Sequence, residues 1–197
     1  MATKKKSRRK AKAKPTRKKT SQKAKRSKAA KVKRPVRTVR AAPKPKPAPK
    51  QLPDVEVSMT GGQRLRLAAL TGRPVVIYFY PKDDTPGCTT EGCDIRDNWG
   101  GFSRSGAVVL GVSRDSIASH ERFKAKFGFP FELIADEDER LCKLFGVMKQ
   151  KSLYGRKYIG VDRSTFVFDR TGALRKEYRD VKVPGHMQEV LAEVQKL

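Results

Sequence analysis

Acidic residues are missing from the first quarter of this 197-residue chain, and this absence dominates its charge. Residues 1–50 contain 23 lysines and arginines and no aspartate or glutamate, whereas residues 51–197 contain the other 23 basic residues and all 20 acidic residues. The net charge of +26 is therefore +23 in the first segment and +3 in the second. A segment with this much charge and few large apolar side chains cannot bury enough apolar surface to offset the loss of backbone entropy on folding. We expect residues 1–50 to form a disordered basic tail.

Long apolar runs are also absent. No stretch of eighteen apolar residues occurs, and the N-terminus lacks the apolar core of a secretory signal, so the sequence predicts neither membrane insertion nor export. We expect a cytoplasmic protein, associated with the nucleoid in a bacterium or located in the nucleus in a eukaryote.

Cysteine and histidine are scarce. Three cysteines are too few for a disulfide framework, and in a reducing compartment a pair of them would be catalytic or sensory. The cysteines together with His120 and His186 do not make a convincing set of four metal ligands. We expect neither a metal nor a cofactor.

Residues 51–197 have the usual size of one domain, and we place its boundary near Gln51. The first half of the domain is expected to contain an edge hairpin over 55–67, a buried strand at 75–80, a helix from about Cys88 to Gly100, a buried strand at 107–112 and a helix over 115–127. A short strand at 131–134, a helix capped by Asp136 that runs to Phe145 and a polar loop over 149–158 are expected to follow. The last expected elements are a hairpin of strands 165–168 and 173–178 and a closing helix over 186–196. We treat residues 129–162 as an insertion. This order predicts an α/β domain with a thioredoxin-like fold, in which helices cover a central mixed sheet.

Cys88 lies where the strand at 75–80, a polar loop and a helix are expected to meet. A helix N-terminus lowers the pKa of a thiol through its unpaired N–H groups and its dipole, and the thiolate is the nucleophilic form. The same N–H groups can hold an oxyanion-like substrate oxygen. Most cysteines are buried and inert, but the polar neighbours Asp83-Asp84 and Thr89-Thr90 argue against that interpretation. Cys88 is therefore predicted to be a nucleophile.

The loop that ends at Cys88 resembles a known active site. Its sequence, Pro81-Lys82-Asp83-Asp84-Thr85-Pro86-Gly87-Cys88, resembles the P-x-x-x-T-x-x-C loop of peroxiredoxins. Further segments are similar to the Q branch of that family, the bacterioferritin-comigratory proteins: Tyr78-Phe79-Tyr80, 89–93, 111–115, 136–138 and 163–166. The resemblance covers about residues 53–197. It implies a thiol-dependent peroxidase that reduces hydrogen peroxide and organic hydroperoxides, is recycled by a thioredoxin-like dithiol and is a monomer or weak dimer.

The resemblance also implies roles for individual residues. Thr85 would hydrogen-bond the peroxide and orient the sulfur, and Pro81 would shield the thiolate from water. Arg163 matches the active-site arginine of the family, whose fixed charge favours the thiolate and polarises the peroxide. Taken singly, these residues would be read as a turn hydroxyl, a strand terminator and a surface arginine.

Cys93 matches the resolving cysteine found in part of the Q branch, so the resemblance implies a Cys88–Cys93 disulfide. Five residues along a helix separate Cα atoms by about 8–9 Å, whereas a disulfide needs less than about 7 Å. We therefore expect the first helical turns to unwind on oxidation, with Glu91-Gly92 as a weak point. Cys142 lies beside apolar residues and is predicted to be a core thiol outside the mechanism.

The basic tail predicts contact with nucleic acid. A flexible chain of 23 positive charges without acids condenses on polyanions and releases counterions without reading bases. Its lysine, arginine, alanine and proline content resembles linker-histone and bacterial histone-like tails. Aromatic residues are absent, so base stacking is not expected. A nuclear-localisation signal within residues 4–34, a solubilising charge run and, less favoured with only three serines, a transit peptide remain alternatives.

Two other functions compete with the peroxidase. One is a histone-like nucleic-acid-binding protein whose thioredoxin-like domain is inactive, which the combination of Thr85, Cys88 and Arg163 argues against. The other is a peroxide sensor that passes its disulfide to a partner, which the sequence does not separate from a scavenger.

Overall fold

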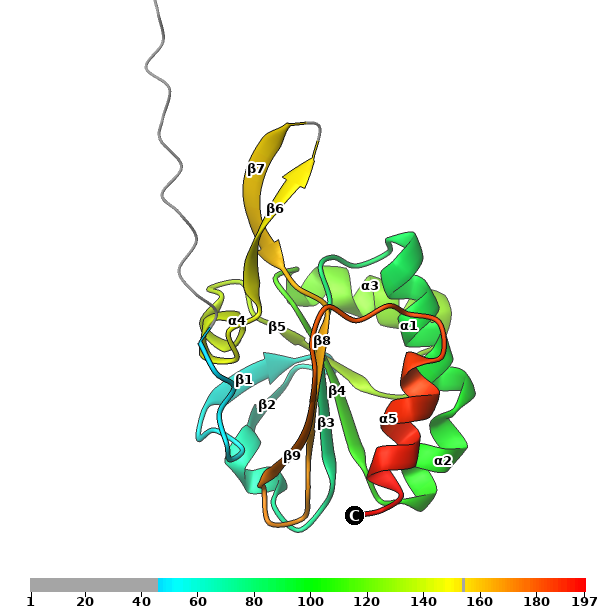
Figure 1. Ribbon diagram of the computed structural model, residues 1–197. Coiled ribbons are helices and arrows are strands. Elements are labelled where there is room, and N and C mark those ends of the chain that lie inside the picture. The colour runs from blue at the N-terminus through cyan, green and yellow to red at the C-terminus, as the bar shows by residue number, and fades with distance from the viewer. Residues whose placement is uncertain (1–45, 154) are drawn as a thin grey trace, which may run out of the picture. The chain divides into compact units, whose positions relative to one another are not determined.

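The computed structural model describes residues 46–153 and 155–197 (Figure 1). Residues 1–45, which make up most of the predicted tail, lie outside the described residues. The strands are β1 (Glu56–Met59), β2 (Gln63–Arg66), β3 (Val75–Phe79), β4 (Val108–Ser113), β5 (Glu132–Ala135), β6 (Met148–Leu153), β7 (Arg156–Val161), β8 (Ser164–Phe168) and β9 (Leu174–Tyr178). The helices are α1 (Pro86–Asp97), α2 (Trp99–Arg104), α3 (Ile117–Phe127), α4 (Arg140–Leu144) and α5 (His186–Val194), with a 3-10 helix at Leu67–Leu70. Within the described part of the chain, no helix is both long and apolar enough to cross a membrane.

Seven strands form one mixed sheet in the order β2-β1-β5-β4-β3-β8-β9. The strands β3, β4 and β5 are parallel, and the hairpins β1–β2 and β8–β9 add antiparallel strands at the two edges. The predicted edge hairpin, the buried strand at 75–80 and the hairpin before the last helix are confirmed. The fold is the predicted thioredoxin-like arrangement.

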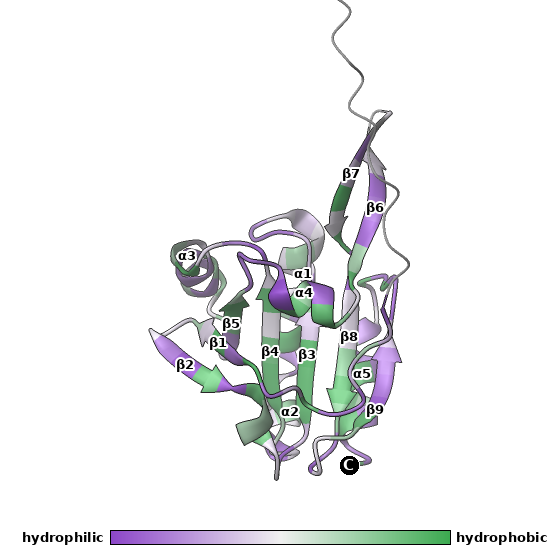
Figure 2. Ribbon diagram, turned by 90° about the vertical axis from the view of Figure 1, so that its left-hand side faces the viewer, coloured by the Kyte–Doolittle hydropathy of each residue, from purple (hydrophilic) through white to green (hydrophobic). Residues whose placement is uncertain are grey.

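Strand β3 has apolar side chains on both faces, because both faces of the sheet are covered. Val75, Ile77 and Phe79 pack in one apolar cluster with residues of α4 and the 3-10 helix. Val76 and Tyr78 pack in the other, which collects residues of α1, α2, α3 and α5. Figure 1 shows α1, α2 and α5 on one side of the sheet and α4 on the other, and Figure 2 shows the apolar strands between these layers.

The predicted insertion at 129–162 is wrong as a single block. Its first strand, β5, lies in the central sheet and pairs in parallel with β4. The predicted polar loop at 149–158 is instead the β6–β7 hairpin, a separate two-stranded sheet that projects from the domain (Figure 1). The charged side chains of this segment led to the prediction of a loop, but an exposed two-stranded ribbon tolerates charged side chains on both faces.

The pair Gly100-Gly101 does not stop a helix as predicted, because both glycines lie inside α2. A Cβ atom at Gly101 would come within 2.6 Å of Leu191 Cδ2. Glycine at this position therefore allows α2 to approach α5 closely.

The folded part of the chain begins before Gln51. Ala48 is buried, and the Leu174 N–H donates to the Lys50 carbonyl at 2.9 Å. A Cβ atom at Gly146 would come within 2.0 Å of the Lys46 carbonyl oxygen, so this glycine makes room for the entering chain. The domain therefore includes residues 46–50.

Candidate active site

Cys88 lies in the first turn of α1, as predicted. Thr85 occupies the N-cap position with extended backbone, Pro86 is the first helical residue, and the first backbone bond of the helix runs from the Thr89 N–H to the Thr85 carbonyl at 2.8 Å. Pro86 has no N–H, and the N–H groups of Gly87 and Cys88 precede the first intrahelical bond. Cys88 is buried beneath this turn. The helix N-terminus thus presents free donors beside the sulfur, an arrangement that favours a negative charge there.

Arg163 brings a fixed positive charge to the same sulfur. Its Nη2 lies 3.3 Å from Cys88 Sγ, although the two residues are 75 positions apart in the chain. Arg163 sits between β7 and β8, and only 13% of its side chain is exposed. A Cβ atom at Gly87 would lie 3.4 Å from Nη2, so the backbone at Gly87 passes close to the guanidinium. The structure brings Arg163 into contact with Cys88, and its role toward the thiolate and the peroxide stays a prediction.

Glu91 is a site residue that the sequence reading missed. It follows Cys88 by one helical turn, is fully buried, and forms an ion pair and a hydrogen bond with Arg163 Nη1. Its other oxygen, Oε1, is buried without a hydrogen-bond partner in the described structure. Burial raises the pKa of Glu91 from 4.5 to about 7, even though the charge of Arg163 acts in the opposite direction. An acidic residue three positions after a helical cysteine was the available signal.

Replacing Glu91 by glutamine should change how stability depends on pH. Between pH 4.5 and about 7 the folded protein holds a proton on Glu91 that the unfolded chain has released, so this group's contribution to stability is lost as pH rises across that window. Glutamine does not titrate. The difference in unfolding free energy, variant minus wild type, should therefore increase across the window by at most about 3 kcal/mol.

Urea unfolding of both proteins at pH 5, 6, 7 and 8 measures this difference. Burial also lowers the pKa of His186, to about 4, but His186 is common to both proteins and cancels in the difference. A difference that does not change with pH would show that Glu91 does not titrate in this window.

Thr85 and Pro81 lie on the loop before Cys88 but are not linked to its sulfur by a hydrogen bond in the described structure. The Thr85 hydroxyl donates to the Lys82 carbonyl at 3.0 Å. Pro81 is half-buried directly after Tyr80, where the chain leaves β3. The structure places both residues in the predicted loop, and their roles toward a substrate stay predictions.

Cys93 lies on α1, five residues after Cys88, and both thiols are free. Cys93 is half-buried and packs against the same apolar cluster that contains Cys88. Between them, a Cβ atom at Gly92 would come within 2.5 Å of Phe129 Cζ, so the glycine allows the Phe129 ring to pack against the helix. The helix is continuous through both cysteines, as the prediction of unwinding on oxidation requires.

Cys142 is a core residue, as predicted. It is fully buried in the apolar cluster on the opposite face of the sheet from Cys88. Burial and the neighbouring Asp136 raise the pKa of its thiol well above the ordinary value. Asp136 is not the N-cap residue of α4 as predicted, because Glu139 occupies that position, but its carboxylate accepts the N–H groups of Leu141 and Cys142 in the first turn. The helix is also shorter than predicted.

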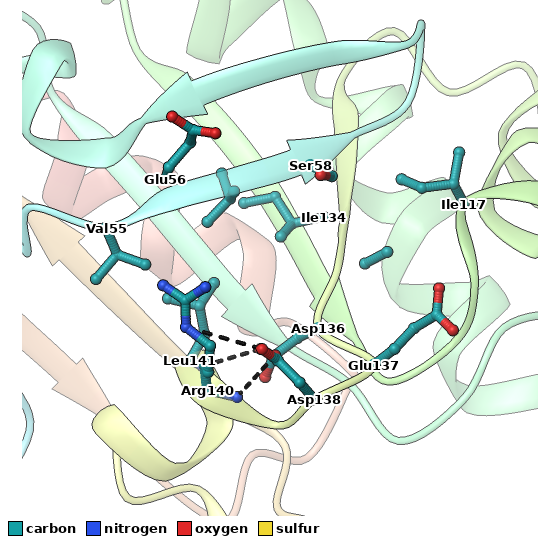
Figure 3. A pocket seen from close by; sticks show the side chains of 12 residues that line it. Val55, Glu56, Ser58, Ile117, Ile134, Asp136, Glu137, Asp138, Arg140 and Leu141 are labelled. Carbon is teal, nitrogen blue, oxygen red and sulfur yellow. Dashed lines mark hydrogen bonds and ion pairs between the residues drawn. The ribbon is translucent and has the colours of Figure 1, made fainter.

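A pocket of about 300 Å³ lies between β1 and the segment that joins β5 to α4 (Figure 3). Figure 3 shows Asp136, Asp138 and Arg140 close together at its wall. None of the five predicted site residues lines this pocket. It is therefore separate from the Cys88 site.

Comparison with known proteins places the chain in a family. Residues 48–177 match the model of the AhpC/TSA family. Peroxiredoxin Bcp of Xanthomonas campestris is 50% identical over 139 residues, which are 71% of this chain and 87% of that protein. Peroxiredoxin Bcp of Bacillus subtilis is 46% identical over 139 residues, which are 71% of this chain and 88% of that protein.

Solved structures agree with the sequence matches. The bacterioferritin comigratory protein of Xanthomonas campestris, described for its alkyl peroxide reduction activity, superposes with a TM-score of 0.71 at 46% identity, covering 76% of this chain and 98% of that structure. BcpB of Mycobacterium tuberculosis gives a TM-score of 0.65 at 30% identity, covering 75% and 95%. With Cys88 at the start of α1 and Arg163 against its sulfur, the chain belongs to the AhpC/TSA family, in its Bcp or peroxiredoxin Q branch.

Proposed function

We propose that this protein is a thiol-dependent peroxidase in which Cys88 is the nucleophile. The observation that carries the proposal is the 3.3 Å contact between Arg163 Nη2 and Cys88 Sγ at the N-terminus of α1. Family membership supports the reaction class. The free N–H groups of the first turn and the guanidinium stabilise a thiolate and also a developing negative charge on a bound oxygen.

The reaction conserves atoms and charge. The Cys88 thiolate attacks one peroxide oxygen, the S–O bond forms as the O–O bond breaks, and the departing oxygen takes a proton to leave as water or an alcohol. Cys88 becomes a sulfenic acid. Arg163 would polarise the peroxide, Thr85 would hydrogen-bond it, and Pro81 would exclude water from the sulfur.

Cys93 would resolve the sulfenic acid. Its thiol attacks the Cys88 sulfur, the S–S bond forms as the S–O bond breaks, and the hydroxyl takes the thiol proton and leaves as water. Because both cysteines lie on one continuous helix, α1 has to unwind, and the contact between Gly92 and Phe129 has to open. An external dithiol of the thioredoxin type would then reduce the disulfide by exchange.

Oxidation should leave a clear record in α1. One equivalent of peroxide is expected to give an intramolecular Cys88–Cys93 bridge together with loss of amide protection over Cys88–Asp97. Peptide mapping identifies the bridge, and hydrogen exchange follows the helix. Cys93→Ser should stop at the sulfenic acid, which a dimedone probe traps. A bridge between Cys88 and Cys142 alone would contradict the assignment of Cys93, and it would have to join thiols from opposite faces of the sheet.

Peroxide consumption with thioredoxin and thioredoxin reductase tests the function directly. We expect turnover with hydrogen peroxide and with organic hydroperoxides, the latter because the similar Xanthomonas protein is described for alkyl peroxide reduction. Turnover with a small dithiol but not with thioredoxin would retain the peroxidase and replace the reductant. No oxidation of Cys88 by any peroxide would contradict the function itself.

The composition of residues 1–50 supports a second proposal, that the tail holds the enzyme near DNA or RNA. It carries 23 positive charges and no acidic residue. Nucleic-acid binding by such a segment is electrostatic and independent of base sequence.

A peroxide sensor that passes its disulfide to a partner would share the chemistry of Cys88. A mixed disulfide between Cys88 and a specific protein would favour the sensor over the scavenger.

A further inference from the structure

A buried hydrogen-bond network holds the loop Pro81–Gly87, called here the active-site loop. Its centre is Asp83, whose carboxylate accepts hydrogen bonds from Tyr80 Oη at 2.7 Å and Ser119 Oγ at 2.7 Å, and faces His120 Nδ1 at 2.9 Å. The Asp83 N–H donates to Asp115 Oδ2 at 2.8 Å. The loop is thereby joined to Tyr80 directly after β3, to α3 and to the turn before α3.

His120 is fully buried, and both of its ring nitrogens face acceptors. Nδ1 faces the Asp83 carboxylate, and Nε2 lies 3.1 Å from the Ile134 carbonyl of β5. Neither a carboxylate nor a carbonyl can donate, so the imidazole ring is the donor in these contacts. The Asp83–His120 contact joins the active-site loop to α3 away from solvent. Burial raises the pKa of Asp83, but the hydrogen bonds from His120, Tyr80 and Ser119 outweigh it and hold that pKa below its ordinary value.

The chain from Asp83 to Thr85 and the start of α1 is short, and its backbone is constrained. Asp84 follows with a left-handed backbone (φ 52°), and Thr85 follows as the N-cap of α1. The Thr85 hydroxyl donates to the Lys82 carbonyl, which closes the loop on itself. A shift of Asp83 would therefore move Thr85 and the first turn of α1 relative to Arg163, which lies on a separate segment between β7 and β8.

We propose that Asp83 and His120 are positioning residues for peroxide reduction, because they fix the active-site loop so that Thr85 and Cys88 meet Arg163 in the reactive geometry. Neither residue contacts the sulfur in the described hydrogen-bond network. The inference rests on the proposed peroxidase function and adds two residues to it. Displacement of a reacting group by about 1 Å can lower a rate about 100-fold, which sets the expected effect.

The same loop and helix offer a matched control. Lys126 of α3 pairs with Asp84 at 2.6 Å, one residue along the loop from Asp83, but half of each side chain or more is exposed. An exposed pair contributes little, whereas a buried charge left without its partner disturbs its surroundings. Lys126→Met therefore removes an ion pair between the same two elements without disturbing the buried network.

The experiment measures two rates for Cys88 in the full-length protein. Stopped-flow mixing with hydrogen peroxide gives the second-order rate constant for oxidation, and iodoacetamide gives the rate of alkylation, which needs a thiolate but no aligned peroxide. Asp83→Ala and His120→Ala should each lower the peroxide rate about 100-fold and change alkylation much less. The double variant should be no slower than the slower single variant, because both changes release the same loop. Asp83→Asn should recover part of the rate.

Lys126→Met should stay within about twofold of wild type, and single variants of Asp83 or His120 that do the same would overturn the proposal. Equal losses in the peroxide rate and the alkylation rate would also overturn it. So would losses of the two single variants that multiply in the double variant. If the alanine variants do not fold, Ser119→Ala removes one hydrogen bond to Asp83 and should lower the peroxide rate about tenfold, and an unchanged rate would overturn the proposal. A wild-type protein that does not reduce peroxide would contradict the proposed function and this inference together, whereas an active wild type with active variants would contradict only the inference.

Discussion

Serine in place of Cys88 should abolish peroxide reduction while the domain stays folded. At this buried position the serine hydroxyl has the Arg163 guanidinium beside it as a hydrogen-bond partner, so the cost in stability is small. A hydroxyl at the N-terminus of α1, even with Arg163 beside it, stays protonated at neutral pH and is a far weaker nucleophile than a thiolate. We expect the rate of peroxide consumption to fall to that of the buffer and the thermal unfolding midpoint to stay near that of wild type.

The control is Cys142→Ser. Cys142 lies on the opposite face of the sheet, and burial raises the pKa of its thiol, so it does not supply a thiolate. This variant should retain turnover, with a packing cost of roughly 1 kcal/mol or more in unfolding free energy, because it buries a hydroxyl where a thiol was. Turnover by Cys88→Ser near that of wild type would overturn the mechanism.

Removing the basic tail should remove most binding to nucleic acid. The full-length protein is expected to bind duplex DNA with little sequence preference, and the logarithm of its affinity should fall linearly with the logarithm of salt concentration. If about 6 tail cations contact phosphates, the slope is near −5, and affinity falls roughly a thousandfold between 50 and 200 mM salt. Electrophoretic mobility shifts at several salt concentrations measure the slope.

The truncation should begin at Lys46 rather than at Gln51, because Ala48 and Lys50 already contact the domain. Residues 46–197 carry +5, which is the +3 of residues 51–197 together with Lys46 and Lys50. The similar Xanthomonas structure is covered over 98% of its length by 76% of this chain, so this fold does not need a comparable tail. The truncated protein should keep its peroxidase activity. Equal DNA affinity with and without residues 1–45 would refute the role of the tail.

Local patterns in the sequence determined those helices, strands and turns that depend on residues close together in the chain. The unbroken apolar run at 75–79 predicts a strand covered on both faces, and β3 is one. A polar loop with proline and glycine ahead of Cys88 predicts a helix start, and α1 begins two residues before the cysteine. The sequence also predicts a hairpin of strands 165–168 and 173–178, and β8 and β9 form it. The sequence also assigned the charge to the tail, because charge depends on composition alone.

Tertiary structure alone decided the features that depend on residues far apart in the chain. Strand β5 belongs to the central sheet because it pairs with β4, and no local signal separates such a strand from one in an insertion. Glu91 and Arg163 are 72 positions apart, and Asp83 and His120 are 37 apart. On a solvated helix or loop, each acidic residue would be an ordinary surface charge. Burial raises the pKa of Glu91 against the opposing effect of Arg163, and the contact with His120 helps to fix the active-site loop at Asp83. Whether a residue is buried, and which residue it contacts, depends on how the sheet and its helices pack together. The residue order along one element does not determine either.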